Sequence, residues 1–183
     1  MIVDIFSSSA IAVGLLMLSV WLLSLLLKNA SIVDIFWGLG FVVIGWVANF
    51  ASDGSSDVGL IVAAMVSIWG LRLAGYLWWR NHGKGEDFRY VAMRKHYGAR
   101  FPLISLVTVF ALQGVLMLAV SIPVQLAQQP STESINALGI FGVLVWLTGL
   151  LFESVGDVQL ARFKARPENS GKVMDKGLWK YTR

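Results

Sequence analysis

The segment IVDIFWGLGFVVIGWVANF, residues 32–50, decides the fold. It is apolar except for Asp34, and it is long enough to cross the hydrocarbon core of a membrane, which takes about 20 residues as a helix. Apolar segments of similar length precede and follow it along the chain. The sequence therefore predicts an all-α protein, a polytopic transmembrane helical bundle.

We predict about five membrane spans, which form a single transmembrane domain over residues 1–183. Polar connectors and a basic loop over residues 80–101 separate the spans, and the last helical pattern continues beyond the membrane toward a tail at 161–183. The predicted spans are residues 10–27, 32–50, 58–79, 102–125 and 136–152.

Composition excludes several classes of protein. The chain has 183 residues, of which 56% are hydrophobic and only 14% charged, whereas soluble domains carry about 25% charged residues. Without cysteine there are no disulfides, thiolate metal sites or cysteine nucleophiles, and two histidines are too few for a histidine-built metal centre. We therefore expect no metal. The net charge of +4 does not indicate nucleic acid as a partner, because the charges flank the spans.

Basic residues gather on one predicted side of the membrane. The segments 1–9, 52–57 and 126–135 contain no Lys or Arg, and all 15 basic residues except Arg72 lie near residue 28, in 80–101 or in 161–183. Because Lys and Arg mark cytoplasmic loops, this pattern predicts the N-terminus outside and the C-terminus inside. We expect a multi-pass protein of the inner-membrane type, with membrane lipids as partners.

Charged residues inside a span cost at least ~2.5–3.5 kcal/mol each, which makes them candidates for function. Asp34 lies near the start of the second span, and Arg72 lies about two turns before the end of the third. By the predicted orientation both lie at the cytoplasmic end, where they either pair or face a polar cavity, with Tyr76 on the same helix face as Arg72. The alternative is that Asp34 is an interfacial helix-start residue and that Arg72 extends outward to the headgroups.

The end of the last helix carries a second polar strip. Glu153, Asp157 and Lys164 fall on one helical face, where the acids can accept hydrogen bonds from ribose hydroxyls and the lysine can neutralise a phosphate. The alternative is an ordinary amphipathic helix beside the membrane. The loop motif DFRY, residues 87–90, mixes aromatic side chains with both signs of charge, which suits docking of an anionic or polar ligand; the alternative is a basic loop facing lipid headgroups. No GxGxxG or Walker A motif is present.

Three stretches resemble a family of bacterial membrane proteins of the steroid 5α-reductase superfamily. They are SIVDIFWGLGF (31–41), LRLAGYLWWR followed by GEDFRY (71–90), and FESVGDVQLARFKARPENSGKVMDKGLWKYTR (152–183). In that family the last motif continues into His-Pro-Asn-Tyr-x-Gly-Glu and further spans. We therefore expect the chain to be C-terminally incomplete relative to the family, and to bind cofactor poorly or be inactive by itself.

The resemblance implies a membrane-embedded reductase that uses NADPH to reduce a double bond conjugated to a ketone, in a hydrophobic steroid-like or lipid-like substrate. It implies that Asp34 polarises the substrate carbonyl, with Tyr76 or Arg72 as its companion. By motif position, the residues implied to contact the cofactor are Glu153, Asp157, Lys164, Tyr181 and Arg183.

Two other functions remain open from the sequence. The related isoprenylcysteine and phospholipid methyltransferases have a similar membrane core and use S-adenosylmethionine instead of NADPH. The acid pair at 153 and 157 and the DIFWG start of the second span favour the reductase. A non-catalytic scaffold or small transporter is the third possibility. Transporters typically have spans interrupted by Gly and Pro near the middle of the membrane, and this signal is weak in the sequence.

Overall fold

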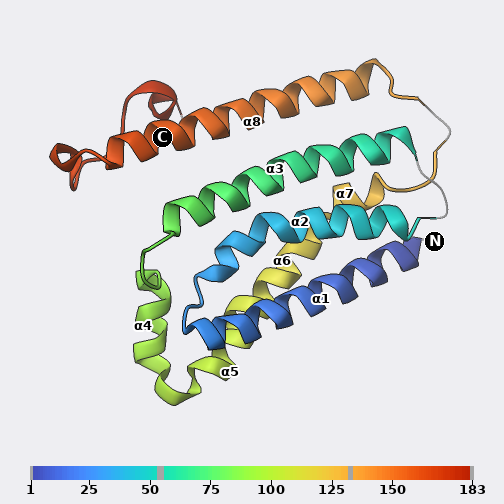
Figure 1. Cartoon of the computed structure of the whole chain (residues 1–183). Helices are drawn as coiled ribbons and strands as arrows, with labels where there is room; N and C mark the ends of the chain where they lie inside the picture. Colours follow the sequence, from blue (N-terminus) through green and yellow to red (C-terminus); the bar gives the residue numbers. More distant parts are fainter. Residues whose placement is uncertain (1, 53–55, 132–133, 182–183) are drawn as a thin grey trace. The chain divides into compact units, whose positions relative to one another are not determined.

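The computed structural model describes residues 2–52, 56–131 and 134–181 (Figure 1). All regular secondary structure in these ranges is helical, which confirms the predicted fold class. Within the same ranges, five helical segments are long and apolar enough to cross a membrane. The chain is therefore a multi-pass membrane protein.

The chain divides into two compact units, Met1–Ser134 and Ile135–Arg183. The first unit contains α1 (Ile2–Leu27), α2 (Ile32–Phe50), α3 (Asp57–Asn81), α4 (Phe88–Tyr97), the 3-10 turn η1 (Gly98–Arg100), α5 (Phe101–Ser105), the π-helical η2 (Leu106–Ala111), α6 (Leu112–Val120) and α7 (Ile122–Leu126). The second contains α8 (Ala137–Lys164) and the 3-10 turns η3 (Pro167–Asn169) and η4 (Gly177–Lys180).

The helices begin and end near the bounds of the predicted spans, with two differences. Helix α1 begins at Ile2 rather than at residue 10, since the polar residues at its start contain no helix breaker. The fourth span is broken at Ser121, just before Ile122 and Pro123, because proline lacks the backbone N–H that a continuous helix needs. Nothing in the sequence explains the π-helical turn η2 within this span.

The basic loop at 80–101 contains a helix that the sequence analysis did not predict. Helix α4 begins after Asp87, whose Oδ1 accepts a hydrogen bond from the backbone N–H of Arg89 at 3.0 Å. It ends at Gly98, whose φ of 52° lies in the left-handed region that glycine adopts readily. The capping signals on both sides of α4 are thus local and were present in the sequence.

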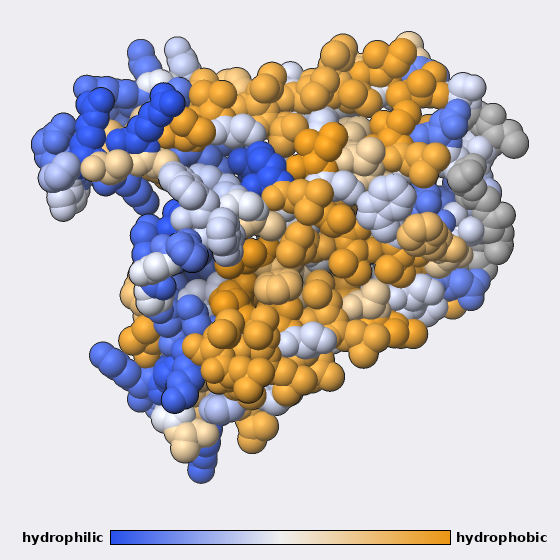
Figure 2. All heavy atoms as spheres, viewed as in Figure 1, coloured by the Kyte–Doolittle hydropathy of each residue, from blue (hydrophilic) through white to orange (hydrophobic). Residues whose placement is uncertain are grey.

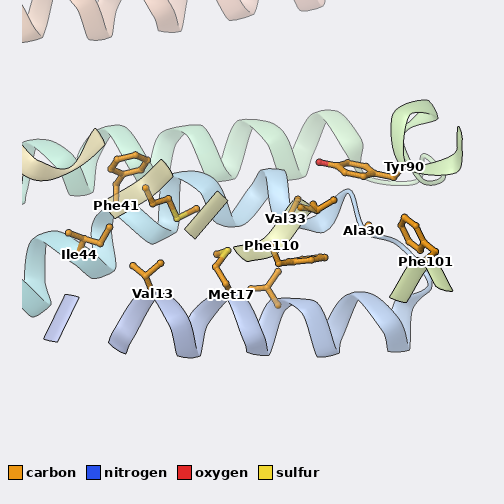
Figure 3. Close-up of a cluster of buried hydrophobic side chains, with 12 residues drawn as sticks. Val13, Met17, Ala30, Val33, Phe41, Ile44, Tyr90, Phe101 and Phe110 are labelled. Carbon is orange, nitrogen blue, oxygen red and sulfur yellow. The ribbon is translucent and has the colours of Figure 1, made fainter. Parts of the chain in front are cut away.

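Helix α2 is the central span of the first unit. It packs against α1 on one side and α3 on the other (Figure 1). In an apolar stretch of 18 residues, 44% of the residues of α2 are buried, compared with 22% in α1 and in α3. The buried cluster around it includes Val13, Met17, Phe41, Ile44 and Phe110 (Figure 3). Helix α2 is therefore held by packing against helices on several sides.

Two glycines allow α2 and α3 to approach each other closely. An ideal Cβ at Gly38 would lie 2.5 Å from the carbonyl oxygen of Gly70, which is closer than real Cβ contacts. Such small residues let helix backbones come together in membranes, where packing rather than the hydrophobic effect holds helices together.

We expect Gly38→Ala to lower the free energy of unfolding by about 1–3 kcal/mol, because the added methyl group would push α2 away from α3. Gly14→Ala is the matched control, since a Cβ at Gly14 in α1 meets nothing within 4 Å. Thermal unfolding of both variants in detergent measures the difference. Equal melting temperatures for the two variants would show that the α2–α3 contact is not tight.

Hydropathy is distributed as a membrane protein requires. In the first unit, hydrophobic residues cover the middle of the spans, and hydrophilic residues gather over α4 and the loop before it (Figure 2). This end of the unit carries the basic residues from which the cytoplasmic side was predicted.

Single cysteines test the predicted orientation cleanly, because the chain has no native cysteine. We expect a membrane-impermeant maleimide added to intact cells to label the Pro130→Cys variant. The Lys95→Cys and Lys172→Cys variants should react only after the cells are permeabilised. Labelling of Pro130→Cys and Lys95→Cys from the same side would reject the predicted topology.

Candidate functional site

The candidate site is built on the turn between α1 and α2. The backbone N–H of Asn29 donates to the carbonyl of Ser24 at 3.0 Å, and Lys28 takes a positive φ of 51°, so the chain reverses within a few residues. Ala30 follows in this turn, just before Ser31, the N-cap residue of α2. Its backbone N–H donates to Oε1 of Glu86 at 2.7 Å.

Glu86 connects the loop before α4 to this turn, and its contacts with Ala30 and Arg94 form what we call the Glu86 clasp. Arg94 donates to both carboxylate oxygens of Glu86, at 2.8 and 3.0 Å, and its guanidinium lies 4.3 Å from the ring centre of Phe101. Burial by itself raises the pKa of Glu86, but the hydrogen bonds from Arg94 and Ala30 and the charge of Arg94 bring it below its ordinary value. Glu86 is therefore a charged, fully engaged anchor and not a free acid.

Asp87 continues the clasp and positions an arginine. Its backbone N–H donates to Oγ of Ser31 at 2.7 Å, and its carboxylate accepts from Nε of Arg89 at 2.9 Å. These bonds from the Arg89 side chain and backbone hold the pKa of Asp87 below its usual range. Arg89 also reaches α2, where its Nη2 lies 3.2 Å from Oδ2 of Asp34.

Tyr90 completes the environment of Asp34. Its phenol donates to Oδ1 of Asp34 at 3.1 Å, and the residue is buried with only 6% of its surface exposed. Figure 3 shows the Tyr90 ring near Val33 at the start of α2. One carboxylate thus meets one phenol and one guanidinium, a set that can polarise a carbonyl oxygen and deliver a proton.

Asp34 was singled out from the sequence, whereas Arg89 and Tyr90 were named only within the DFRY motif and not as partners of Asp34. Asp34 and Tyr90 are 56 positions apart in sequence, and the clasp rather than a helical spacing brings them together. The ring of Tyr76 lies 6.0 Å from that of Trp79 and 5.7 Å from the guanidinium of Arg80. Arg72 is half-buried on α3. The catalytic roles of Tyr76 and Arg72 stay predictions.

The second unit brings together the two acids that the sequence assigned to a cofactor. Glu153 and Asp157 line a cavity of about 250 Å³ on α8, together with Gly156, Leu178 and Trp179. The wall formed by η4 is fixed in place, since Nε1 of Trp179 donates to the carbonyl of Gly156 at 2.9 Å.

A side-chain amide on α8 holds the other side of this wall. The N–H of Leu178 donates to Oε1 of Gln159 at 2.9 Å. Gly177 has a φ of 62° and passes so close to the Gln159 amide that a side chain there would collide with it. The cavity therefore has a defined shape within the second unit.

The other predicted cofactor contacts do not line this cavity. Lys164 is exposed at the last residue of α8, and Tyr181 is 75% exposed after η4. Arg183 lies outside the described residues. The structure thus groups Glu153 with Asp157 but adds neither Lys164 nor Tyr181 to them.

Comparison with known proteins gives one match. The model of the family described as "Protein of unknown function (DUF1295)" matches residues 20–183. The chain belongs to this family. The DUF1295 family is known as steroid 5α-reductase-like, in agreement with the predicted resemblance. No curated protein and no solved structure matches the chain.

Metal ligands are not clustered in the part of the chain that the structure describes. Over residues 2–52, 56–131 and 134–181, no group of three or more His, Asp or Glu side chains is placed to hold a metal ion.

The Glu86 clasp makes stability depend on pH. Because the folded pKa of Glu86 lies below its ordinary value of 4.5, its contribution to stability is complete above that pH and is lost as the pH falls through the folded pKa. We expect Glu86→Gln to lower the free energy of unfolding at pH 7 by about 1–2 kcal/mol and to flatten this acid-side loss. Melting temperatures between pH 3 and 7 measure both effects.

Glu168→Gln is the control for this experiment. Glu168 is exposed in η3, and its substitution removes the same charge. A melting temperature for Glu86→Gln that follows the wild-type pH curve would show that the clasp does not stabilise the fold.

Proposed function

We propose that this protein is a membrane-embedded, NADPH-dependent reductase of a hydrophobic enone, acting in a bacterial inner membrane. The observation that carries the proposal is the hydrogen bond of 3.1 Å from the buried Tyr90 phenol to the Asp34 carboxylate at the end of a span. A proton-donating group at a water-poor position is what the reduction of a conjugated ketone requires. Membership of the DUF1295 family supports the same reaction class.

The residues of the second unit fit one part of NADPH. Carboxylates accept hydrogen bonds from ribose hydroxyls, and Glu153 and Asp157 both line the cavity beside the Trp179 indole. Its volume of about 250 Å³ suits a nucleoside-sized group rather than the whole cofactor, since sites for complete small molecules measure about 300–1,000 Å³. Arg162 and Lys164 in the last turn of α8 are available for phosphates.

In this proposal residues of the first unit bind the substrate oxygen. NADPH supplies a hydride for the β-carbon of the enone. The Tyr90 phenol turns its hydrogen from Asp34 to the ketone oxygen and so stabilises the enolate that develops there. The α-carbon then takes up one proton, which gives the saturated ketone. Asp34 orients the phenol. The exposed Arg89 lies on the other side of Asp34, so the carboxylate connects the phenol to protons from water.

Ligand binding separates this function from its competitors. We expect NADPH to raise the melting temperature of the purified protein and S-adenosylmethionine to leave it unchanged, because only a ligand selective for the folded state stabilises it. A methyltransferase would show the reverse result, and a non-catalytic membrane protein would respond to neither ligand.

Activity measurements test the assigned residues. With the full-length protein, NADPH and enone steroids or lipid enones as substrates, we expect Asp34→Asn and Tyr90→Phe to lower kcat by about 10²-fold or more. Tyr97→Phe on the same helix is the control, because Tyr97 is exposed and its ring contacts His96. Loss of activity in Tyr76→Phe with full activity in Tyr90→Phe would instead assign the donor role to Tyr76.

A further inference from the structure

A second cavity of about 350 Å³ lies at the end of the first unit where α2 begins and α3 ends. It is formed by the α1–α2 turn, the first turn of α2, the last turn of α3 and the loop that leads to α4. Because these are the ends of membrane spans, the cavity lies at the level of a membrane interface.

One side of this cavity is apolar. Ile35, Trp78 and Phe88 line it, and Trp78 and Phe88 are 58% and 79% exposed. An aromatic side chain at a span end typically sits among lipid headgroups, with its ring against the upper part of the acyl chains. The apolar side therefore suits the first carbons of a lipid and not a water-soluble ion.

The other side is polar and carries one unneutralised positive charge. Asn81, His82 and Lys84 contribute to it. The two carboxylates in the lining are already neutralised, Glu86 by Arg94 and Asp87 by Arg89. Among the described residues, no carboxylate lies within ion-pair distance of Lys84. The local field at the polar side thus favours an anion.

We propose that this cavity binds the headgroup of an anionic phospholipid, with Lys84 as the cation for the phosphate and the acyl chains passing Trp78 and Phe88 into the bilayer. The volume of about 350 Å³ suits a headgroup, which leaves the chains in the membrane. The proposal uses neither Tyr90 nor the acids of the second unit, so it stands or falls separately from the reductase function.

Native mass spectrometry of the delipidated protein in detergent tests this site, with dihexanoyl phosphatidylglycerol as the probe. We expect one lipid to bind per chain more tightly than dihexanoyl phosphatidylcholine, and Lys84→Gln to weaken its binding about fivefold, the effect of one basic residue near an anionic surface. Lys95→Gln is the matched control, because Lys95 is an exposed lysine on α4 outside the lining.

A second variant blocks the cavity without changing charge. A Cβ at Gly85, which lines the cavity, meets nothing within 4 Å, so Gly85→Leu should fold normally and reduce lipid binding by filling the space. Equal binding in wild type, Lys84→Gln and Gly85→Leu would overturn the proposal. So would an equal loss in Lys95→Gln, which indicates general surface attraction, or inorganic phosphate binding as tightly as the lipid, which removes the role of the acyl chains.

Discussion

The first unit depends on the contact between the Glu86 carboxylate and the turn that leads into α2. A buried backbone N–H without a hydrogen-bond partner is costly, and Ala30 in this turn is only 1% exposed. Glu86 accepts from the N–H of Ala30, and its negative charge is balanced by two hydrogen bonds from Arg94. Without the arginine the carboxylate would be costly to bury, and without the carboxylate the loop would keep only the hydrogen bond from Asp87 to Ser31 at this turn.

The position of the residues around Asp34 depends on that clasp. The loop it holds leads directly into α4, so Arg89 and Tyr90 fall beside the Asp34 carboxylate. The same loop closes the interfacial cavity over the end of α3. The tight Gly38–Gly70 contact is the complementary constraint, because it fixes α3 against α2 and so fixes the cavity wall that α3 provides.

The long apolar helices could be predicted from the sequence because the physical requirement for them is local. A helix that crosses a bilayer needs about 20 apolar residues, and this is visible in any single segment, as residues 32–50 illustrate. Helix α4 was missed although Asp87 and Gly98 mark its ends, since its polar composition resembles an exposed loop. The pairing of Tyr90 with Asp34 could not be predicted from sequence spacing, because it arises from the fold of the whole loop. The motif DFRY was nevertheless identified as a ligand-binding candidate, and two of its four residues contact Asp34.

The arrangement of charges around Asp34 also bears on how the proposed reaction proceeds. A carboxylate at a span end needs compensation, and Asp34 has it from Arg89 and Tyr90. Arg89 is shared, because it pairs with Asp87 as well, at 2.9 Å against 3.2 Å for Asp34. When the Tyr90 phenol turns its hydrogen to the substrate oxygen, Asp34 therefore keeps Arg89 as its partner and is not left as an unpaired anion near the membrane. Asp87 holds Arg89 in place for this role, because the bond between Asp87 and Arg89 does not involve the substrate.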